Sequence, residues 1–206
     1  MCCYTRLRLT VGRRSCQALW DLYSSFSTIG CNYHLSLDEM VAMVPKRPAY
    51  GDVNLVISHA RRKAIIAAVM AQRLQEEQPK ETLLIPKGAD PNSQDIVVWP
   101  GVILTACLES VSKHGIYNSQ LLRVIRWSSE GLELQCTESA QRYTVPQNWG
   151  SLRHAAAITY AAVQGRSCTN QTVVLWDTTS KRMSRRHLVM GLSRASSIHD
   201  VWIGEA

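Results

Sequence analysis

The chain has 206 residues, of which 46% are hydrophobic, so it can bury the core of one lobe with a small insert. Its formal net charge of +7 favours a polyanionic partner, although ordinary soluble proteins can carry the same balance. The sequence has neither the apolar core of a secretion signal nor a run of about 18 apolar residues, so it predicts no export and no membrane insertion.

The first predicted helix begins after Ser36. Ser36 and Glu39 have the spacing of a capping box, in which each side chain accepts a hydrogen bond from the other's backbone N–H, and Met40–Val44 continues the helix. The pair Asp38 and Glu39 also has the composition of a Mg²⁺ site, but no apolar strand precedes it. We therefore interpret both carboxylates as part of a helix start.

A strand and a longer helix are predicted next. Leu55–Ile57 is a short apolar run typical of a buried strand, Ser58 is a favourable N-cap, and residues 64–74 contain no helix breaker. The basic run Arg61–Lys63 lies at the start of this helix, where it is either solvated or binds a ligand. The polar stretch Gln72–Pro91 has the composition of a linker.

Short β-strands are predicted between residues 96 and 146. Four or five apolar runs alternate with turn residues such as Pro100–Gly101 and Asn118–Ser119, a pattern that suits a small β-barrel. The aromatic residues of these runs either fill its core or offer stacking faces to bases. These residues are Trp99, Tyr117, Trp127 and Tyr143.

The C-terminal third contains two further predicted strands. Ala155–Val163 is apolar apart from Thr159 and Tyr160 and predicts a strand that runs into a helix, which Gln164–Gly165 ends. Val173–Trp176 has the continuous apolar character of a buried parallel strand.

The last motif is an arginine that follows an apolar run. We expect Leu188–Met190 to lead Arg194 just past a strand, where its guanidinium could bind phosphate bidentately. The sequence from Thr159 to Gly165 and the sequence Gly191–Arg194 resemble motifs V and VI of superfamily 1 DNA helicases, in the RecD-like and Pif-like branch. The two motifs occur in the family's order, with the expected strand between them.

Two further segments resemble the same family. Ser58 and His59, followed by Arg62, are similar to motif IV, but Ile66 stands where the family usually has asparagine. The segment Leu7–Ser15 resembles the connector that follows the first motor lobe. Tyr117–Ser119 is similar to the turn that marks the family's inserted SH3-like barrel.

The resemblance implies an α/β fold, namely a RecA-like second motor lobe interrupted by a small SH3-like β-barrel. The implied domains are residues 1–85 and 149–206 for the lobe and residues 86–148 for the barrel. It also implies a role for nine residues. Arg194 would be the arginine finger, Arg62, Gln164 and Gly165 would serve the nucleotide, and Ser58, His59, Asn118, Thr159 and Tyr160 would contact nucleic acid, with no metal ligand.

The sequence contains no Gly-x-x-x-x-Gly-Lys-Ser/Thr motif to cradle phosphates. The family's ATP and Mg²⁺ are therefore implied only for a complete motor, and we expect the isolated chain to be inactive and to bind neither tightly. The implied partners are single-stranded DNA and a separate chain that carries the first lobe, in the cell interior, in a nucleus or at a site of DNA replication. The alternative is a non-enzymatic nucleic-acid-binding or scaffold domain derived from such a lobe.

Overall fold

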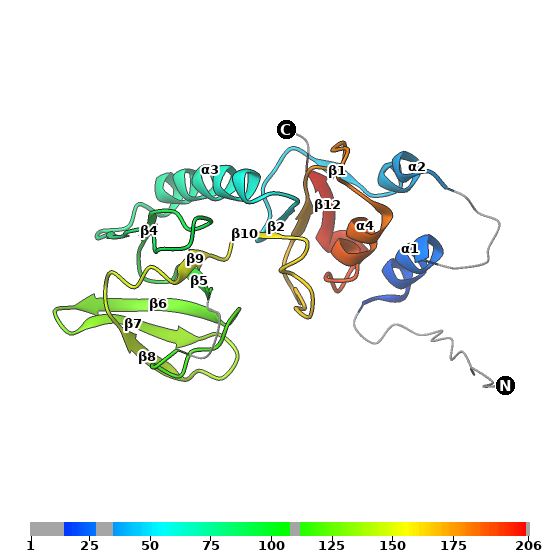
Figure 1. Ribbon diagram of the computed structural model, residues 1–206. Helices are drawn as coiled ribbons and strands as arrows, with labels where there is room; N and C mark the ends of the chain where they lie inside the picture. Colours follow the sequence, from blue (N-terminus) through cyan, green and yellow to red (C-terminus); the bar gives the residue numbers. More distant parts are fainter. Residues whose placement is uncertain (1–14, 28–34, 108–111, 205–206) are drawn as a thin grey trace. The chain divides into compact units, whose positions relative to one another are not determined.

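The computed structural model describes residues 15–27, 35–107 and 112–204 of the chain. The backbone forms two compact units (Figure 1). The first comprises Met1–Ile57 together with Ile158–Ala206, and the second is the intervening segment Ser58–Ala157. Apart from Ser15, the predicted connector Leu7–Ser15 lies outside the described residues. No helix among the described residues is long and apolar enough to cross a bilayer.

A five-stranded sheet with the order β1-β12-β11-β2-β10 forms the centre of the first unit. Strand β12 runs parallel to β1 and β11, and β11 runs parallel to β2. Because neighbouring strands are not consecutive in sequence, crossover connections link them, which confirms the predicted α/β class. The strands are β1 (Lys46–Arg47), β2 (Val53–Val56), β10 (Ala157–Thr159), β11 (Val173–Leu175) and β12 (Val201–Gly204).

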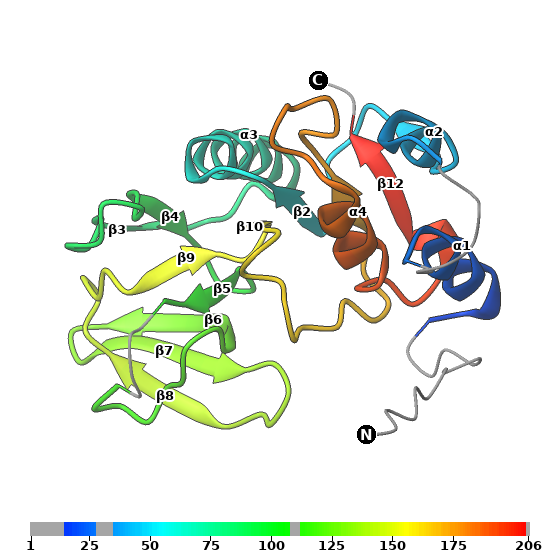
Figure 2. The ribbon, with the colours of Figure 1, turned by 45° about the vertical axis from the view of Figure 1, so that its right-hand side comes forward.

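The described residues of this unit also form four short helices. These are α1 (Gln17–Ser27), α2 (Leu37–Ala42), α4 (Arg185–Leu192) and the 3-10 helix η1 (Ile198–Asp200). Helix α4 packs on β11, and α1 packs on α4 (Figure 2). The approach of α4 requires Gly191, because a Cβ atom there would lie 2.5 Å from Leu175 Cδ2 and 3.2 Å from Tyr160 Cε1. Leu175 is fully buried in the apolar core of this unit.

Local capping explains where two of the predicted helices begin. The backbone N–H of Ser36 donates to Glu39 Oε2 at 2.6 Å and that of Glu39 donates to Ser36 Oγ at 3.2 Å, which confirms the capping box. Ser58 Oγ accepts from the N–H of Arg61 at 3.1 Å, which confirms Ser58 as the N-cap of the long helix α3 (His59–Glu77). Because α3 continues to Glu77, the linker prediction for Gln72–Pro91 is wrong over its first part.

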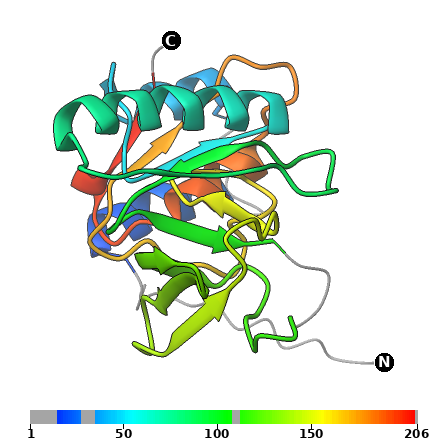
Figure 3. The same cartoon turned by 90° about the vertical axis from the view of Figure 1, so that its left-hand side faces the viewer.

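The second unit consists of α3, a hairpin and a five-stranded antiparallel sheet with the order β8-β7-β6-β5-β9 (Figure 3). The short strands that we predicted for this region are therefore present. That the sheet closes into an SH3-like barrel, and that this barrel spans residues 86–148, remain predictions. The hairpin is β3 (Leu83–Ile85) with β4 (Ile96–Val98), and the sheet strands are β5 (Ile103–Ala106), β6 (Leu121–Ser128), β7 (Gly131–Cys136), β8 (Arg142–Val145) and β9 (Leu152–His154).

Two predicted elements have a different secondary structure. Leu188–Met190 lies in helix α4 and is not a strand, because Ser184 caps the helix by accepting a hydrogen bond from the N–H of His187 at 3.4 Å. The strand β10 runs into hydrogen-bonded turns and not into a helix. Thr159 Oγ1 accepts a hydrogen bond from the N–H of Ala162, which closes a turn. Gly165 has a φ of +87°, which is not helical. Too few residues lie between Thr159 and Gly165 for a helix to form.

Candidate functional site

The first candidate site is the turn that follows β10. Thr159 is buried, its carbonyl oxygen accepts from the N–H groups of Ala162 and Val163 at 2.9 and 3.1 Å, and its Oγ1 also accepts from Ala162. These bonds close a compact turn that leaves Gln164 and Gly165 exposed to solvent. The two predicted nucleotide-contacting residues are thus available, whereas Thr159 mainly shapes the backbone.

Tyr160 is a core residue. Its side chain is 1% exposed, and its hydroxyl donates to the carbonyl oxygen of Trp176 at 3.1 Å. Burial, followed by the charge of Asp177, raises the pKa of this phenol. The side chain therefore joins β10 to the end of β11 and offers no stacking face to a nucleic acid, which was not apparent from the alternating polarity of the sequence.

Arg194 joins the turn after β10 to the end of α4. Its Nη1 donates to the carbonyl oxygen of Arg166 at 2.8 Å, and its Nε donates to that of Met190 at 3.2 Å. The carbonyl oxygen of Arg194 accepts from the N–H of Cys168 at 2.9 Å. Arg194, the last residue of the second predicted motif, is therefore in direct contact with the residue that follows the first predicted motif, 28 residues earlier in the sequence. Arg194 follows a helix and not the predicted strand, but its half-buried guanidinium still lies beside the motif V turn.

Asp177 is a feature of this unit that the sequence did not reveal. It follows β11, has a φ of +61°, and its Oδ2 accepts from the N–H of Ile57 at the end of β2 at 2.9 Å. Positive φ is uncommon in residues other than glycine and is best tolerated by asparagine and aspartate. Asp177 therefore holds together the carboxyl ends of two neighbouring parallel strands, the edge where α/β sheets usually bind ligands.

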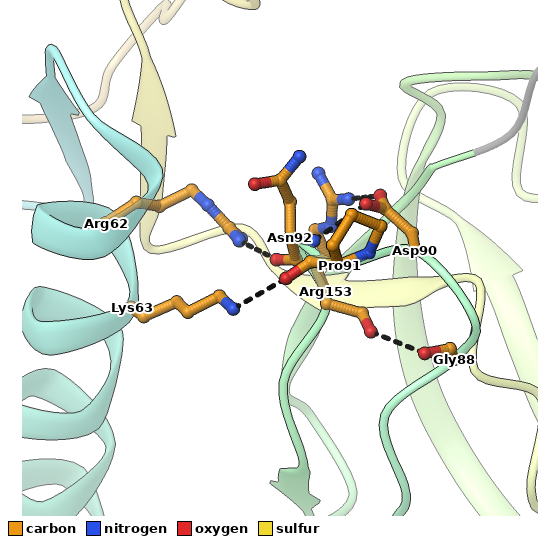
Figure 4. Close-up of polar contacts among 8 residues, drawn as sticks. Arg62, Lys63, Gly88, Asp90, Pro91, Asn92 and Arg153 are labelled. Atoms are coloured by element: carbon orange, nitrogen blue, oxygen red, sulfur yellow. Dashed lines mark hydrogen bonds and ion pairs between the residues drawn. The ribbon is translucent and has the colours of Figure 1, made fainter.

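The second candidate site lies in the second unit, at the start of α3 (Figure 4). Arg62 and Lys63 extend from this helix to the loop between β3 and β4, where Arg62 Nη2 donates to the carbonyl oxygen of Asn92 at 2.5 Å and Lys63 Nζ to that of Pro91 at 3.1 Å. Arg62 is only 3% exposed. The predicted nucleotide contact Arg62 is thus bound to a loop of its own unit.

Arg153 of β9 completes this site from the opposite direction. Its guanidinium forms an ion pair with Asp90 of the same loop, although 63 residues separate them in sequence. The N–H of Asn92, followed by the charge of Arg153, lowers the pKa of Asp90. Burial lowers the pKa of His59, and Arg62 and Arg153 lower it further, so His59 is neutral near pH 7. No local sequence signal distinguishes Arg153 from an ordinary strand arginine.

The predicted contact Asn118 lies apart from these groups, in an exposed turn of the second unit. The N–H of Ser119, which has a φ of +67°, donates to the carbonyl oxygen of Ala106 at 2.8 Å. Glycine adopts such a positive φ at the least steric cost, so Ser119 occupies a turn position that glycine would also suit. The neighbouring Tyr117 is 60% exposed, whereas Trp99 and Tyr143 are buried in the core, so only part of the aromatic set can stack on bases.

The predicted site residues thus form separate groups. The first unit brings Thr159, Gln164 and Gly165 close to Arg194, and the second unit brings Ser58, His59 and Arg62 together. The structure brings Asn118 into neither group. These placements leave the predicted ligand roles as predictions.

No family model matches this sequence, and no curated protein matches it. Several solved structures match its fold. One contains two coordinating Pif1 helicases that unwind forked double-stranded DNA, with 16% identity, a TM-score of 0.62 and coverage of 95% of this chain and 48% of that one. A second is Pif1 of Bacteroides bound to single-stranded DNA, with 15% identity and a TM-score of 0.62. The match covers 93% of this chain and 50% of that one. A third is Pif1 helicase from Bacteroides in complex with ADP-AlF3 and single-stranded DNA, with 15% identity and a TM-score of 0.53. The match covers 90% of this chain and 44% of that one.

The chain therefore spans about half the length of the Pif1 helicases that it resembles. At these identities the likeness establishes the fold. The parallel α/β sheet is that of a RecA-like lobe, and the resemblance predicted from the motifs is confirmed at the level of fold.

Proposed function

We propose that this chain is the second motor lobe of a Pif1-like superfamily 1 DNA helicase, from its C-terminal half. The contact between Arg194 Nη1 and the carbonyl oxygen of Arg166 carries this proposal, because it joins the last residue of the second motif to the residue that directly follows the first motif. A lobe of this kind grips a single strand with one motif and faces the nucleotide with the other. The segment 86–148 would be its SH3-like insert and residues 1–85 and 149–206 the lobe itself.

In the complete motor this lobe would close the second side of an ATP site. ATP and Mg²⁺ would supply the transferable phosphoryl group and its charge neutralisation, and a first motor lobe would hold them. The guanidinium of Arg194 would leave its carbonyl acceptors to meet the phosphoryl oxygens, while Gln164 and Gly165 would transmit strand contacts to it. A cationic side chain at this point lowers the barrier because charge develops on the phosphoryl group in the transition state.

The strand grip would use polar groups of each unit. In the first unit the exposed Gln164 would contact the strand from the turn that the buried Thr159 shapes, and in the second unit the half-buried Ser58 and His59 and the exposed Asn118 would contribute. The net charge of +7 supports a phosphate-rich partner. Single-stranded DNA is the partner bound by solved relatives of this fold. We expect the protein to act inside the cell, in a nucleus or at a site of DNA replication.

Fluorescence anisotropy with a labelled single-stranded oligonucleotide tests the grip. Affinity should fall as salt rises, because phosphate contacts release counterions. Gln164→Ala should weaken binding, whereas Gln72→Ala, which removes an exposed glutamine of α3, should not. Failure to bind at low salt, or equal effects of both variants, would remove the basis of the proposal.

A second candidate function is that of a non-enzymatic nucleic-acid-binding or scaffold domain. It is favoured by the hydrogen bonds that Arg194 makes inside its own unit, because they give this arginine a structural use without any nucleotide. The two functions differ in one observable. A separately expressed first lobe should gain strand-stimulated ATP turnover from this chain if it is a motor part, and should gain none if it is a scaffold.

A further inference from the structure

Three residues at the start of α3, one in the loop between β3 and β4 and one of β9 form a basic cluster. We define it as His59, Arg62, Lys63, Asp90 and Arg153. All five belong to the second unit. Arg62, Lys63 and Arg153 bring three permanent positive charges, and Asp90 is the only carboxylate among the five. The cluster therefore carries excess positive charge at a place where much of its surface is removed from water.

Arg62 is the least solvated member of the basic cluster. Its side chain is 3% exposed, and while Nη2 donates to Asn92, Nε and Nη1 are buried without an acceptor among the described residues. The same holds for Arg153 Nε, and His59 Nδ1 is likewise buried without a hydrogen-bond partner in the described part of the chain. Buried donors without acceptors are unfavourable, and those on a charged group most of all.

The backbone adds further positive potential. Helix α3 has 19 residues, and its amino end, which carries the positive end of the helix dipole, opens at His59. Ser58 Oγ accepts from the N–H of Arg61, which leaves other first-turn N–H groups without an intrahelical acceptor. The start of α3, the buried guanidinium of Arg62 and the guanidinium of Arg153 thus meet at the loop between β3 and β4 (Figure 4).

We propose that the basic cluster binds a phosphate group, with Arg62, Arg153 and His59 donating to its oxygens and Asp90 occupying part of the site until it binds. A phosphate offers several acceptor oxygens around one centre, which suits guanidinium donors that approach from two sides. The sources that share this chemistry are a phosphodiester of single-stranded nucleic acid and a free phosphate or nucleotide. In its nucleic-acid form the inference rests on the proposed function.

The resident carboxylate explains why the cluster is stable without a ligand. Asp90 is 47% exposed at its side chain and also accepts from the N–H of Asn92 at 2.8 Å, so it can release Arg153 and remain hydrogen-bonded. An incoming phosphate would then replace one carboxylate by a group of higher charge. Arg62, which is held by Asn92, would form the fixed floor of the site.

Proton NMR of the histidine side chains tests the site directly. Burial, followed by the cationic neighbours Arg62, Arg153 and Lys63, keeps the pKa of His59 below its usual value, and Asp90 acts in the opposite direction. Titration with inorganic phosphate should raise the pKa of His59, because a bound anion stabilises the imidazolium form. His199, an exposed histidine of the first unit, is the internal control. A His59 that does not respond to phosphate would overturn the inference.

Paired substitutions then distinguish the sources of phosphate. Arg153→Gln should weaken both the His59 response and single-strand binding, by about tenfold, and should reduce the salt slope by about 0.7. Asp90→Asn, which keeps an oxygen for the turn, should strengthen both. Arg123→Gln, which removes an exposed arginine of β6, should leave the His59 response unchanged. These variants leave Arg62, and hence the fold, intact.

The outcomes separate this inference from the proposed function. If His59 responds to phosphate but the chain binds no single strand, the phosphate site stands and the helicase-lobe proposal fails. If the chain binds single strands and neither His59 nor the variants at Arg153 and Asp90 respond, the proposed function stands and the phosphate site is refuted. If phosphate moves His59 and Arg153→Gln leaves strand binding unchanged, the nucleic-acid source is refuted in favour of free phosphate or nucleotide.

Discussion

Replacement of Arg194 by alanine should destabilise the first unit even without a nucleotide. The guanidinium donates to the carbonyl oxygens of Arg166 and Met190 at 2.8 and 3.2 Å and to Ser193 Oγ at 2.9 Å. Hydrogen bonds to a charged group contribute about 1.5–3 kcal/mol each, but two of these partners are near neighbours in sequence and the side chain is half-buried. The bond to Arg166 dominates, so we expect a loss of about 2 kcal/mol.

Urea denaturation followed by circular dichroism measures this loss. The matched control is Arg186→Ala, which removes an exposed arginine from the same helix and should change the free energy of unfolding by less than about 0.5 kcal/mol. Amide hydrogen exchange gives a local readout. The N–H of Cys168, which donates to the carbonyl oxygen of Arg194, should lose protection in Arg194→Ala and keep it in the control.

Equal stability of Arg194→Ala and Arg186→Ala would refute this reasoning. It would mean that the guanidinium does not hold the turn after β10 and is free to act elsewhere. A loss well above about 3 kcal/mol would also contradict it, because a half-buried side chain that retains access to water cannot contribute so much.

Two further predictions concern the cores of the two units. Gly191→Ala should lower the urea midpoint, because a Cβ 2.5 Å from the fully buried Leu175 costs about 1–3 kcal/mol, more than the gain of about 1 kcal/mol in helix propensity; a raised midpoint would contradict this packing. Burial lowers the pKa of His154 to about 4, so the unfolded chain binds this proton first, and stability should fall between about pH 6.5 and pH 4 by up to about 1.4 kcal/mol per unit. Denaturation of His154→Gln should show a weaker pH dependence over that interval, and an unchanged dependence would show that His154 does not titrate in this way.

Features set by neighbouring residues could be predicted from the sequence. The capping box of Ser36 and Glu39 and the N-cap Ser58 depend on contacts between residues three positions apart. The buried strand that begins at Val173 is indicated by an unbroken apolar run. Leu188–Met190 was misinterpreted because three apolar residues fit a strand and a helix equally well. The N-cap signal at Ser184 would have identified the helix.

Features that depend on distant segments could not be predicted in this way. Arg153 meets Asp90 across 63 residues, and Arg62 turns toward Asn92 across 30, so neither contact leaves a local pattern. The buried hydroxyl of Tyr160 finds its hydrogen-bond acceptor in the carbonyl oxygen of Trp176, which directly follows β11, 16 residues further along the chain. In contrast, the motif resemblance singled out both Arg194 and the Gln164–Gly165 turn, which the structure places near each other, because a family motif carries tertiary information that periodicity lacks.

The most direct test of the motor assignment is ATP turnover with a first lobe supplied. The chain would be joined to the Walker-motif lobe of a Pif1 helicase, and hydrolysis would be measured with and without single-stranded DNA. Neither part alone should turn over ATP efficiently, and the joined protein should show strand-stimulated turnover that Arg194→Ala, checked to be folded, lowers by roughly 10³-fold in kcat with little change in strand affinity. Turnover that is unaffected by Arg194→Ala, or no gain over the first lobe alone, would contradict the assignment of this chain as a second motor lobe.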